Sequence, residues 1–190
     1  MGDKIQKVSL IGFPGTGKSS VCNELEKSGF VTKDLDLEVE QYCNKSITEI
    51  IRVEGIDYFR QIETEVLKKV IKGNFQCLSL GGGAIFTSAN REILKENFIT
   101  VISIECDYEV LVNRLLNDEK ESFSKNNQAK RPLFAIACEE YDELSIKKLI
   151  RKLYNERIDR YKEYSNQVID CKTLDPIEIA KLISKVILKK

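Results

Sequence analysis

The chain has 190 residues, of which 42% are hydrophobic and 32% charged, so it is long and apolar enough to fold as a soluble globular domain. Basic and acidic residues balance at 30 each, which excludes recognition of nucleic acid or of an anionic membrane through overall charge. The absence of histidine excludes Ser-His-Asp and Cys-His hydrolases, and six scattered cysteines without zinc-binding spacing indicate free thiols. Because the sequence shows neither a membrane span nor a secretory signal, we expect a cytoplasmic protein. We also expect a monomer.

Short apolar runs alternate with amphipathic helices along the whole chain. This alternation is typical of an α/β domain in which helices cover both faces of a parallel sheet. We predict a single domain over residues 1–190, with strands near Val8–Ile11, Phe30–Lys33, Cys77–Leu80, Ile99–Ile104 and Val168–Asp170.

The first predicted strand leads directly into Gly12-Phe13-Pro14-Gly15-Thr16-Gly17-Lys18-Ser19. This run matches the phosphate-loop pattern G-x-x-x-x-G-K-S/T, in which backbone N–H groups surround a polyphosphate, the lysine reaches the β- and γ-phosphates and the hydroxyl binds Mg²⁺. An ordinary glycine-rich turn that carries a lysine is the alternative. The strand before the loop and the helix after it favour the phosphate loop, since the helix directs its positive end at the same anion.

Residues from about 37 to 71 form a predicted helical insertion between the second and third strands. Ser46 and Glu49 have the spacing of a capping box, and Gly55 separates this helix from a longer one over about Asp57–Ile71. Arg60 and Glu63 share one side of the longer helix, where such a pair is usually exposed to solvent.

Two further segments follow strands and should meet the phosphate loop at the carboxyl edge of the sheet. Asp34 and Asp36 follow the second strand, where one carboxylate could assist a metal ion and the other face an acceptor hydroxyl; a cap on the following helix explains them equally well. The run Gly81-Gly82-Gly83 follows the third strand. Three glycines are costly in a plain turn, which favours close approach of the backbone to a ligand.

The segment Asn117–Lys130 is dominated by polar residues and shows no apolar period, so we predict either a mobile lid or a disordered surface loop. In the helix predicted over about Glu143–Tyr164, Arg157 is in phase with the apolar residues. An inward guanidinium requires an anionic partner. The last helix is predicted to begin at Pro176.

Several short motifs in this order resemble those of the shikimate kinase family. The resemblance covers the chain from Lys7 to about Leu188, and it rests on the phosphate loop together with Asp34-Leu35-Asp36, Ser46–Ile50, Glu54-Gly55, Phe59–Glu63, Leu80–Ala84, Arg131-Pro132-Leu133, and Arg157 with Tyr161. It implies a P-loop kinase fold with strand order 2-3-1-4-5, a substrate-binding insertion at about 37–71 and a lid at about 117–133. The implied activity is phosphorylation of shikimate by ATP to shikimate 3-phosphate, in aromatic amino-acid biosynthesis.

The resemblance also implies roles for individual residues. ATP would be bound by Gly12, Gly15, Thr16, Gly17, Lys18, Ser19, Ser20, Arg114, Arg131 and Pro176. Shikimate would be bound by Asp36, Arg60, Gly81, Gly82, Gly83 and Arg157, with the two arginines on its carboxylate. Lys18, Asp36 and Arg131 would be catalytic, while Mg²⁺ would lie near Ser19 and Asp34.

The chain departs from the family pattern in three places. Ile56 stands where an acidic residue is common, Ser20 where threonine is common, and the segment before Arg131 looks longer than usual. The third departure leaves open whether Lys125 or Lys130 shares or replaces the role of Arg131. Two other functions also stay open from the residues: a kinase of the same fold acting on gluconate or a nucleoside monophosphate, and a nucleotide-binding protein without catalysis.

Overall fold

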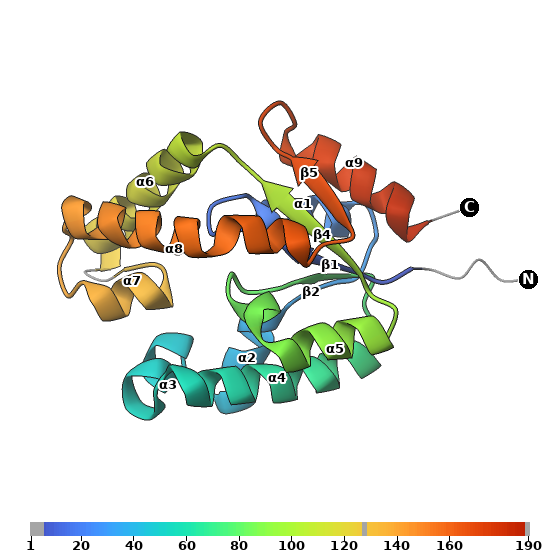
Figure 1. The fold of residues 1–190 in the computed structure, drawn as a ribbon, viewed down its shortest axis with the longest axis horizontal. Coiled ribbons are helices and arrows are strands. Elements are labelled where there is room, and N and C mark those ends of the chain that lie inside the picture. Colours follow the sequence, from blue (N-terminus) through green and yellow to red (C-terminus); the bar gives the residue numbers. More distant parts are fainter. Residues whose placement is uncertain (1–5, 127–128, 189–190) are drawn as a thin grey trace, which may run out of the picture.

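A five-stranded parallel sheet of order β2-β3-β1-β4-β5 organises the chain (Figure 1). The computed structural model describes residues 6–126 and 129–188. Its strands are β1 (Val8–Ile11), β2 (Thr32–Asp34), β3 (Cys77–Ser79), β4 (Thr100–Glu105) and β5 (Gln167–Asp170). The predicted order and all five predicted strands are confirmed, with small shifts at their ends.

The central strand β1 is buried along its whole length, and it pairs with β3 on one side and β4 on the other. Because both faces of such a strand are covered, most of its residues are apolar. This explains why the run Val8–Ile11 could be predicted as a strand from the sequence. Asp34 pairs with Ser79, and Ser79 pairs with Leu10, so β2, β3 and β1 end at one edge. The loops that follow these three strands are therefore brought together.

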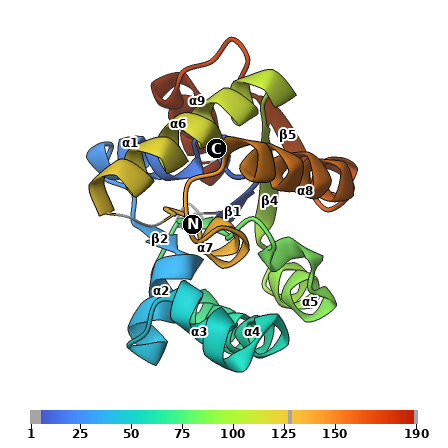
Figure 2. The same ribbon diagram turned by 90° about the vertical axis from the view of Figure 1, so that its left-hand side faces the viewer.

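Helices cover both faces of the sheet (Figure 2). On one face lie α1 (Lys18–Lys27) and α9 (Pro176–Ile187), which pack against each other. On the other lie α4 (Ile56–Lys72), α5 (Ser88–Glu96) and α8 (Glu143–Glu163). The remaining helices are α2 (Leu35–Cys43), α3 (Ile47–Glu54), the short 3₁₀ helix η1 (Ala84–Phe86), α6 (Tyr108–Asn126) and α7 (Pro132–Ala137).

Local capping signals place the helix ends as predicted. The Ser46 hydroxyl accepts from the backbone N–H of Glu49, whose carboxylate in turn accepts from the N–H of Ser46, and this capping box starts α3. Asp175 and Glu178 make the same reciprocal pair at the start of α9, where Pro176 occupies the first turn. Each pair satisfies backbone N–H groups that a helix leaves without partners, so sequence alone defines these starts.

The segment Asn117–Lys130 corrects our sequence-based expectation. It is not a loop over most of its length, because α6 continues to Asn126. Along α6 the buried residues Leu111, Leu115, Glu119 and Phe123 recur every four positions and so lie on one face. The apolar period was present, but the buried carboxylate of Glu119 interrupted it; residues 127–128 lie outside the described residues.

The composition-based expectations can be compared with the same structure. Within the described ranges, no helix is long and apolar enough to span a membrane. All six cysteines are free thiols, and Cys43 is the least buried of them. The largest fully buried side chains include Tyr161, Phe13, Phe75 and Phe134, together with apolar residues of β1 and β3, so the core surrounds the central strands.

Candidate active site

A cleft of about 660 Å³ opens at the carboxyl edge of the sheet. Every site residue proposed from the sequence lines it except Gly12. These are Gly15, Thr16, Gly17, Lys18, Ser19, Ser20, Asp34, Asp36, Arg60, Gly81, Gly82, Gly83, Arg114, Arg131, Arg157 and Pro176. Residues far apart in the sequence thus share one cavity of a size typical for small-molecule sites.

The phosphate loop is held in one shape by its own contacts. Gly12 has φ 144°, and a Cβ there would lie 2.4 Å from the carbonyl oxygen of Ile104, so only glycine fits. The buried Thr16 hydroxyl donates to the Phe13 carbonyl at 3.0 Å and is therefore directed into the loop. Gly17 is the N-cap of α1 without a side-chain cap, which leaves the first N–H groups of that helix directed at the cleft.

Lys18 lies at the centre of this loop. Its Nζ donates to the Gly12 carbonyl at 2.8 Å and to the Phe13 carbonyl at 3.3 Å. Desolvation by the surrounding protein lowers the pKa of Lys18 to about 8, although Asp36 and Asp34 oppose this shift. The ammonium group is thus held against the loop by hydrogen bonds, and Lys18 is followed by the exposed residues Ser19 and Ser20.

Asp34, the last residue of β2, and Asp36, in the first turn of α2, have different surroundings. Oδ1 of Asp34 accepts from the backbone N–H groups of Asp36 at 2.9 Å and Leu37 at 3.4 Å, so Asp34 is the N-cap of α2. The capping alternative considered for this pair is therefore realised at Asp34. Burial, followed by the negative charges of Asp34 and Glu63, raises the pKa of Asp36 to about 7. Asp36 can consequently change its protonation state near neutral pH.

The three glycines after β3 allow side chains to approach the backbone. A Cβ on Gly81 would lie 2.3 Å from Oδ1 of Asp36, and one on Gly83 would lie 2.1 Å from Nη2 of Arg60. Any larger residue would displace one of these two charged groups. The glycine run is therefore explained by close approach of side chains to its backbone. These side chains, Asp36 and Arg60, are two of those that we expected to bind shikimate.

Arg60 is held by an ion pair with Glu63, with 2.7 Å between Nη1 and Oε1. Our expectation that this pair is exposed to solvent was wrong, because Glu63 is fully buried. Burial raises the pKa of Glu63, against the opposing charge of Arg60. The carboxylate therefore fixes the guanidinium of Arg60 at the wall of the cleft.

Arg157 reaches the same wall from α8. Its Nη1 donates to the Gly82 carbonyl at 3.2 Å, and the buried Tyr161 hydroxyl donates to that carbonyl as well. The guanidinium also lies 5.7 Å from the centre of the Phe86 ring. Two arginines from different helices thus border the glycine run, an arrangement suited to a carboxylate.

Arg131 lines the cleft as the N-cap residue of α7. Its guanidinium pairs with Asp118 at 2.7 Å and with the fully buried Glu119 at 2.6 Å. Partial burial acts to raise the pKa of Asp118, but the hydrogen bond and charge of Arg131 hold it below its usual value. Contrary to the expectation of a loop residue, Arg131 is anchored by two carboxylates of α6.

The two lysines considered as substitutes for Arg131 lie in different places. Lys130 lines the cleft, donates its backbone N–H to Glu119 at 2.7 Å, and pairs its Nζ with Asp118 at 3.3 Å. Lys125 instead pairs with Glu121 at the exposed surface of α6. Only Lys130 therefore lies in a position to supplement the charge of Arg131.

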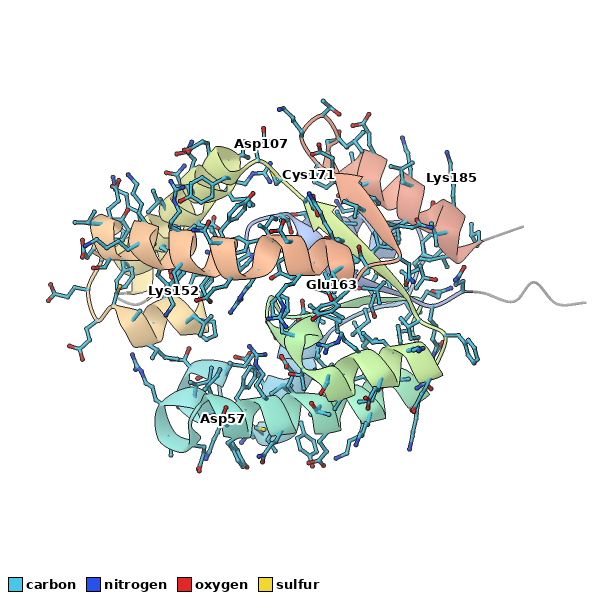
Figure 3. The ribbon with its side chains drawn as sticks, viewed as in Figure 1. Asp57, Asp107, Lys152, Glu163, Cys171 and Lys185 are labelled. Carbon is cyan, nitrogen blue, oxygen red and sulfur yellow. The ribbon has the colours of Figure 1, made fainter. Side chains whose placement is uncertain are left out.

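Arg114, Cys171 and Pro176 also line the cleft. Nη1 of Arg114 donates to the Gly15 carbonyl at 3.2 Å and lies 3.9 Å from Sγ of Cys106. Cys171, labelled in Figure 3, directly follows β5. Through its bond to Gly15, Arg114 lies directly beside the phosphate loop.

Comparisons with known proteins were made against this geometry. The shikimate kinase family model matches residues 14–188. A shikimate kinase of Streptococcus thermophilus (strain ATCC BAA-491 / LMD-9) is 34% identical over 175 residues, covering 92% of this chain and 96% of that protein. One of Dictyoglomus turgidum (strain DSM 6724 / Z-1310) is 35% identical, covering 90% and 95%. The chain belongs to the shikimate kinase family.

The solved structures agree with this membership. The structure of a shikimate kinase from Acinetobacter baumannii in complex with shikimate matches with a TM-score of 0.74 and 27% identity, covering 98% of this chain and 94% of that one. A shikimate kinase from Aquifex aeolicus matches with a TM-score of 0.69, also at 27% identity. The chain is accordingly an enzyme that phosphorylates shikimate with ATP, in aromatic amino-acid biosynthesis.

Sequence reasoning missed the residues that hold the functional side chains in place. Asp118 and Glu119 anchor Arg131, and Tyr161 shares the Gly82 carbonyl with Arg157. A readable signal existed for Glu119, because it is a carboxylate four residues from Leu115 and four from Phe123 on an otherwise apolar face. A charged residue in such a position needs a buried partner of opposite charge.

Proposed function

We propose that ATP lies along the phosphate loop with its adenine towards Arg114 and Pro176, and that shikimate lies between Asp36, the glycine run and the two arginines. Asp36 carries this proposal. It is a half-buried carboxylate with a pKa of about 7, and among the charges that act on it are Lys18 of the phosphate loop and Arg60 of the acceptor wall. A group in that position can receive a hydroxyl proton at the junction of the two substrates.

On the acceptor side, Arg60 and Arg157 would bind the carboxylate of shikimate through charge-assisted hydrogen bonds. Arg60 is already fixed by Glu63 and Arg157 by the Gly82 carbonyl, so little side-chain freedom is lost on binding. Asp36 would accept a hydrogen bond from the 3-hydroxyl and take its proton as the bond to phosphorus forms. This orientation supplies the in-line geometry that phosphoryl transfer requires.

On the nucleotide side, Lys18 would move its ammonium from the loop carbonyls to the transferring phosphate. Arg131 would add a second positive charge from α7, with Lys130 as a neighbour on the same side. Together they would stabilise the negative charge on the phosphoryl oxygens in the transition state, the largest contribution that a protein makes to this reaction.

The residues also fit the magnesium ion that kinases of this type use. The Ser19 hydroxyl and the carboxylate of Asp34 both line the cleft beside Lys18, and oxygen atoms are the ligands that Mg²⁺ prefers. Oδ1 of Asp34 caps α2, which leaves Oδ2 available to help hold the ion. When bound with ATP, Mg²⁺ neutralises phosphate charge. We further propose that the protein is a cytoplasmic monomer.

The test is ADP release measured with shikimate, gluconate and a nucleoside monophosphate as separate acceptors. Shikimate should give turnover about a hundredfold or more above the other two, because it alone carries both a carboxylate for the two arginines and a ring hydroxyl for Asp36. Turnover with gluconate or a nucleoside monophosphate but not with shikimate would overturn the proposed acceptor. Binding of ATP without any acceptor-dependent turnover would instead support a nucleotide-binding protein without catalysis.

A further inference from the structure

A side-chain hydrogen bond connects α3 to α7, two helices whose residues line the cleft. Arg52, on α3, donates from Nη2 to the carbonyl oxygen of Ala135, on α7, at 2.7 Å. The two helices lie next to each other in both ribbon views, although they belong to segments more than eighty residues apart. The bond is charge-assisted and spans from the acceptor-binding segment to the segment that carries Arg131.

The α7 end of this bond is one helical turn from Arg131. The backbone N–H of Ala135 donates to the carbonyl of Arg131 at 2.9 Å, so the group that Arg52 binds belongs to the same turn that orients Arg131. The carbonyl of Ala135 lies in the last turn of α7, where carbonyls have no partner within the helix and a positive charge is favourable. Arg52 therefore caps the C-terminal end of α7.

This cap matters because α7 is short. A helix of six residues is marginal by itself and depends on contacts outside it. Its N-terminal end is fastened to α6 through Arg131, Asp118 and Glu119, and its C-terminal end to α3 through Arg52. The position of Arg131 over the cleft is consequently set from both ends.

The α3 end of the bond leads to the acceptor site. Gly55 is at once the C-cap of α3 and the N-cap of α4, so α3 continues into α4 across one residue. Arg60 lies in the second turn of α4 and lines the acceptor wall. A shift of α4 around a bound acceptor would thus be passed directly to α3 and to Arg52.

We propose that Arg52 is a positioning residue that couples occupation of the acceptor site to the placement of Arg131. The inference rests on the proposed function, because it requires Arg131 to act on the transferring phosphate. Arg52 is not among the residues that line the cleft. Its effect on catalysis passes through Ala135 and α7.

The decisive experiment is a double-mutant cycle of Arg52→Ala and Arg131→Ala, read out as kcat and KM for shikimate and as the dissociation constant for ADP. Arg52→Ala should lower kcat about tenfold, close to the lower end of what loss of one hydrogen bond to a charged group costs, and leave ADP binding unchanged. In the Arg131→Ala background the same change should have no further effect on kcat. Arg52→Lys, which can still donate to a carbonyl, should recover part of the loss.

The control is Arg151→Ala, which removes an exposed arginine of α8 that stacks on Tyr108 outside the cleft. It should leave all three constants within twofold of the parent protein. Thermal unfolding midpoints of all variants show whether each is folded, and Arg52→Lys preserves a testable protein if Arg52→Ala unfolds.

The outcomes separate the two levels of inference. A parent protein without shikimate-dependent turnover would overturn the proposed function. An active parent in which Arg52→Ala keeps full kcat would overturn the coupling alone. Equal and multiplicative losses in the parent and Arg131→Ala backgrounds would also overturn it, since they would mean that Arg52 acts independently of Arg131.

Discussion

The phosphate loop and the segment from Asn117 to Ala137 carry charges to the same cleft but are built in opposite ways. The loop is a contiguous run whose shape is set by its own glycines, its internal hydrogen bonds and the helix that follows. The second segment obtains its shape from distant partners: Arg131 depends on α6, and α7 depends on Arg52 of α3. A site built from one contiguous segment can be predicted from the sequence, whereas a site assembled from tertiary contacts cannot.

The first test removes the charge of the self-contained region. Lys18→Ala should lower kcat about a thousandfold, because it deletes a positive charge from the phosphate in the transition state. The fold should remain, since the side chain donates only to two loop carbonyls. Steady-state ADP release with circular dichroism as a folding check measures both. Lys27→Ala, on the exposed end of the same helix, is the matched control; a folded Lys18→Ala protein with normal kcat would contradict the loop assignment.

The second test removes the charge of the assembled region. Arg131→Ala should lower kcat about a hundredfold and also destabilise the protein by about 1–3 kcal/mol, because it leaves the buried Glu119 without its cationic partner. Urea unfolding measures the stability change and ADP release the rate. Adding Glu119→Gln to Arg131→Ala should restore stability without restoring kcat. If the single variant is as stable as the parent, the anchoring of Arg131 by Glu119 is not what holds this region.

The third test concerns the proposed acceptor site at Arg60, Arg157 and Gly81–Gly83. This site combines a contiguous glycine run with side chains from distant helices. Arg157→Ala should weaken shikimate binding about tenfold to fiftyfold and leave ATP binding unchanged, since a charge-assisted contact to a carboxylate is lost. Isothermal calorimetry with each substrate separates the two affinities. Arg160→Ala, a neighbouring arginine that stacks on Phe86 and Tyr164, serves as the control. If Arg157→Ala loses affinity for ATP but keeps affinity for shikimate, the assignment of Arg157 to the acceptor site is wrong.

The pH dependence gives a smaller but independent effect. Burial raises the pKa of Asp36 to about 7 and lowers that of Lys18 to about 8. If Asp36 must be ionised and Lys18 protonated, kcat/KM should rise as pH passes about 7 and fall as it passes about 8, giving a narrow maximum. A profile that is flat from pH 6 to 9 would show that neither group titrates in the free enzyme.

The same shift predicts a change in stability with a definite sign. The pKa of Asp36 is higher in the folded protein than its value of 3.8 in an unfolded chain. Its contribution to folding is therefore fully present below about pH 4 and is lost as the pH rises through about 7. Asp36→Asn should accordingly raise the melting temperature, relative to the parent, by more at pH 8 than at pH 4. Asp159→Asn, at an exposed position of α8, should show no such difference.

How much could be foreseen from the sequence follows the same division. The five strands, the capping box at Ser46, the helix start at Pro176 and the phosphate loop depend on local periodicity or short motifs, and all of them were predicted from the residues. The strand order was predicted only through the resemblance to the shikimate kinase family. Arg157 was noticed because it broke an apolar face. Glu119 broke an apolar face in the same way, yet the polar residues around it hid the period of α6. The Arg52–Ala135 bond involves a backbone carbonyl, which leaves no mark on residue identity.

The resting position of Lys18 has a consequence for the end of the catalytic cycle. Before nucleotide arrives, the ammonium satisfies the carbonyls of Gly12 and Phe13, and in the proposed mechanism it leaves both when it turns to the phosphate. In the bound state of that mechanism, the two carbonyls lack this donor. Release of ADP would free the ammonium to donate to them again, which would return the loop to the arrangement that receives the next nucleotide.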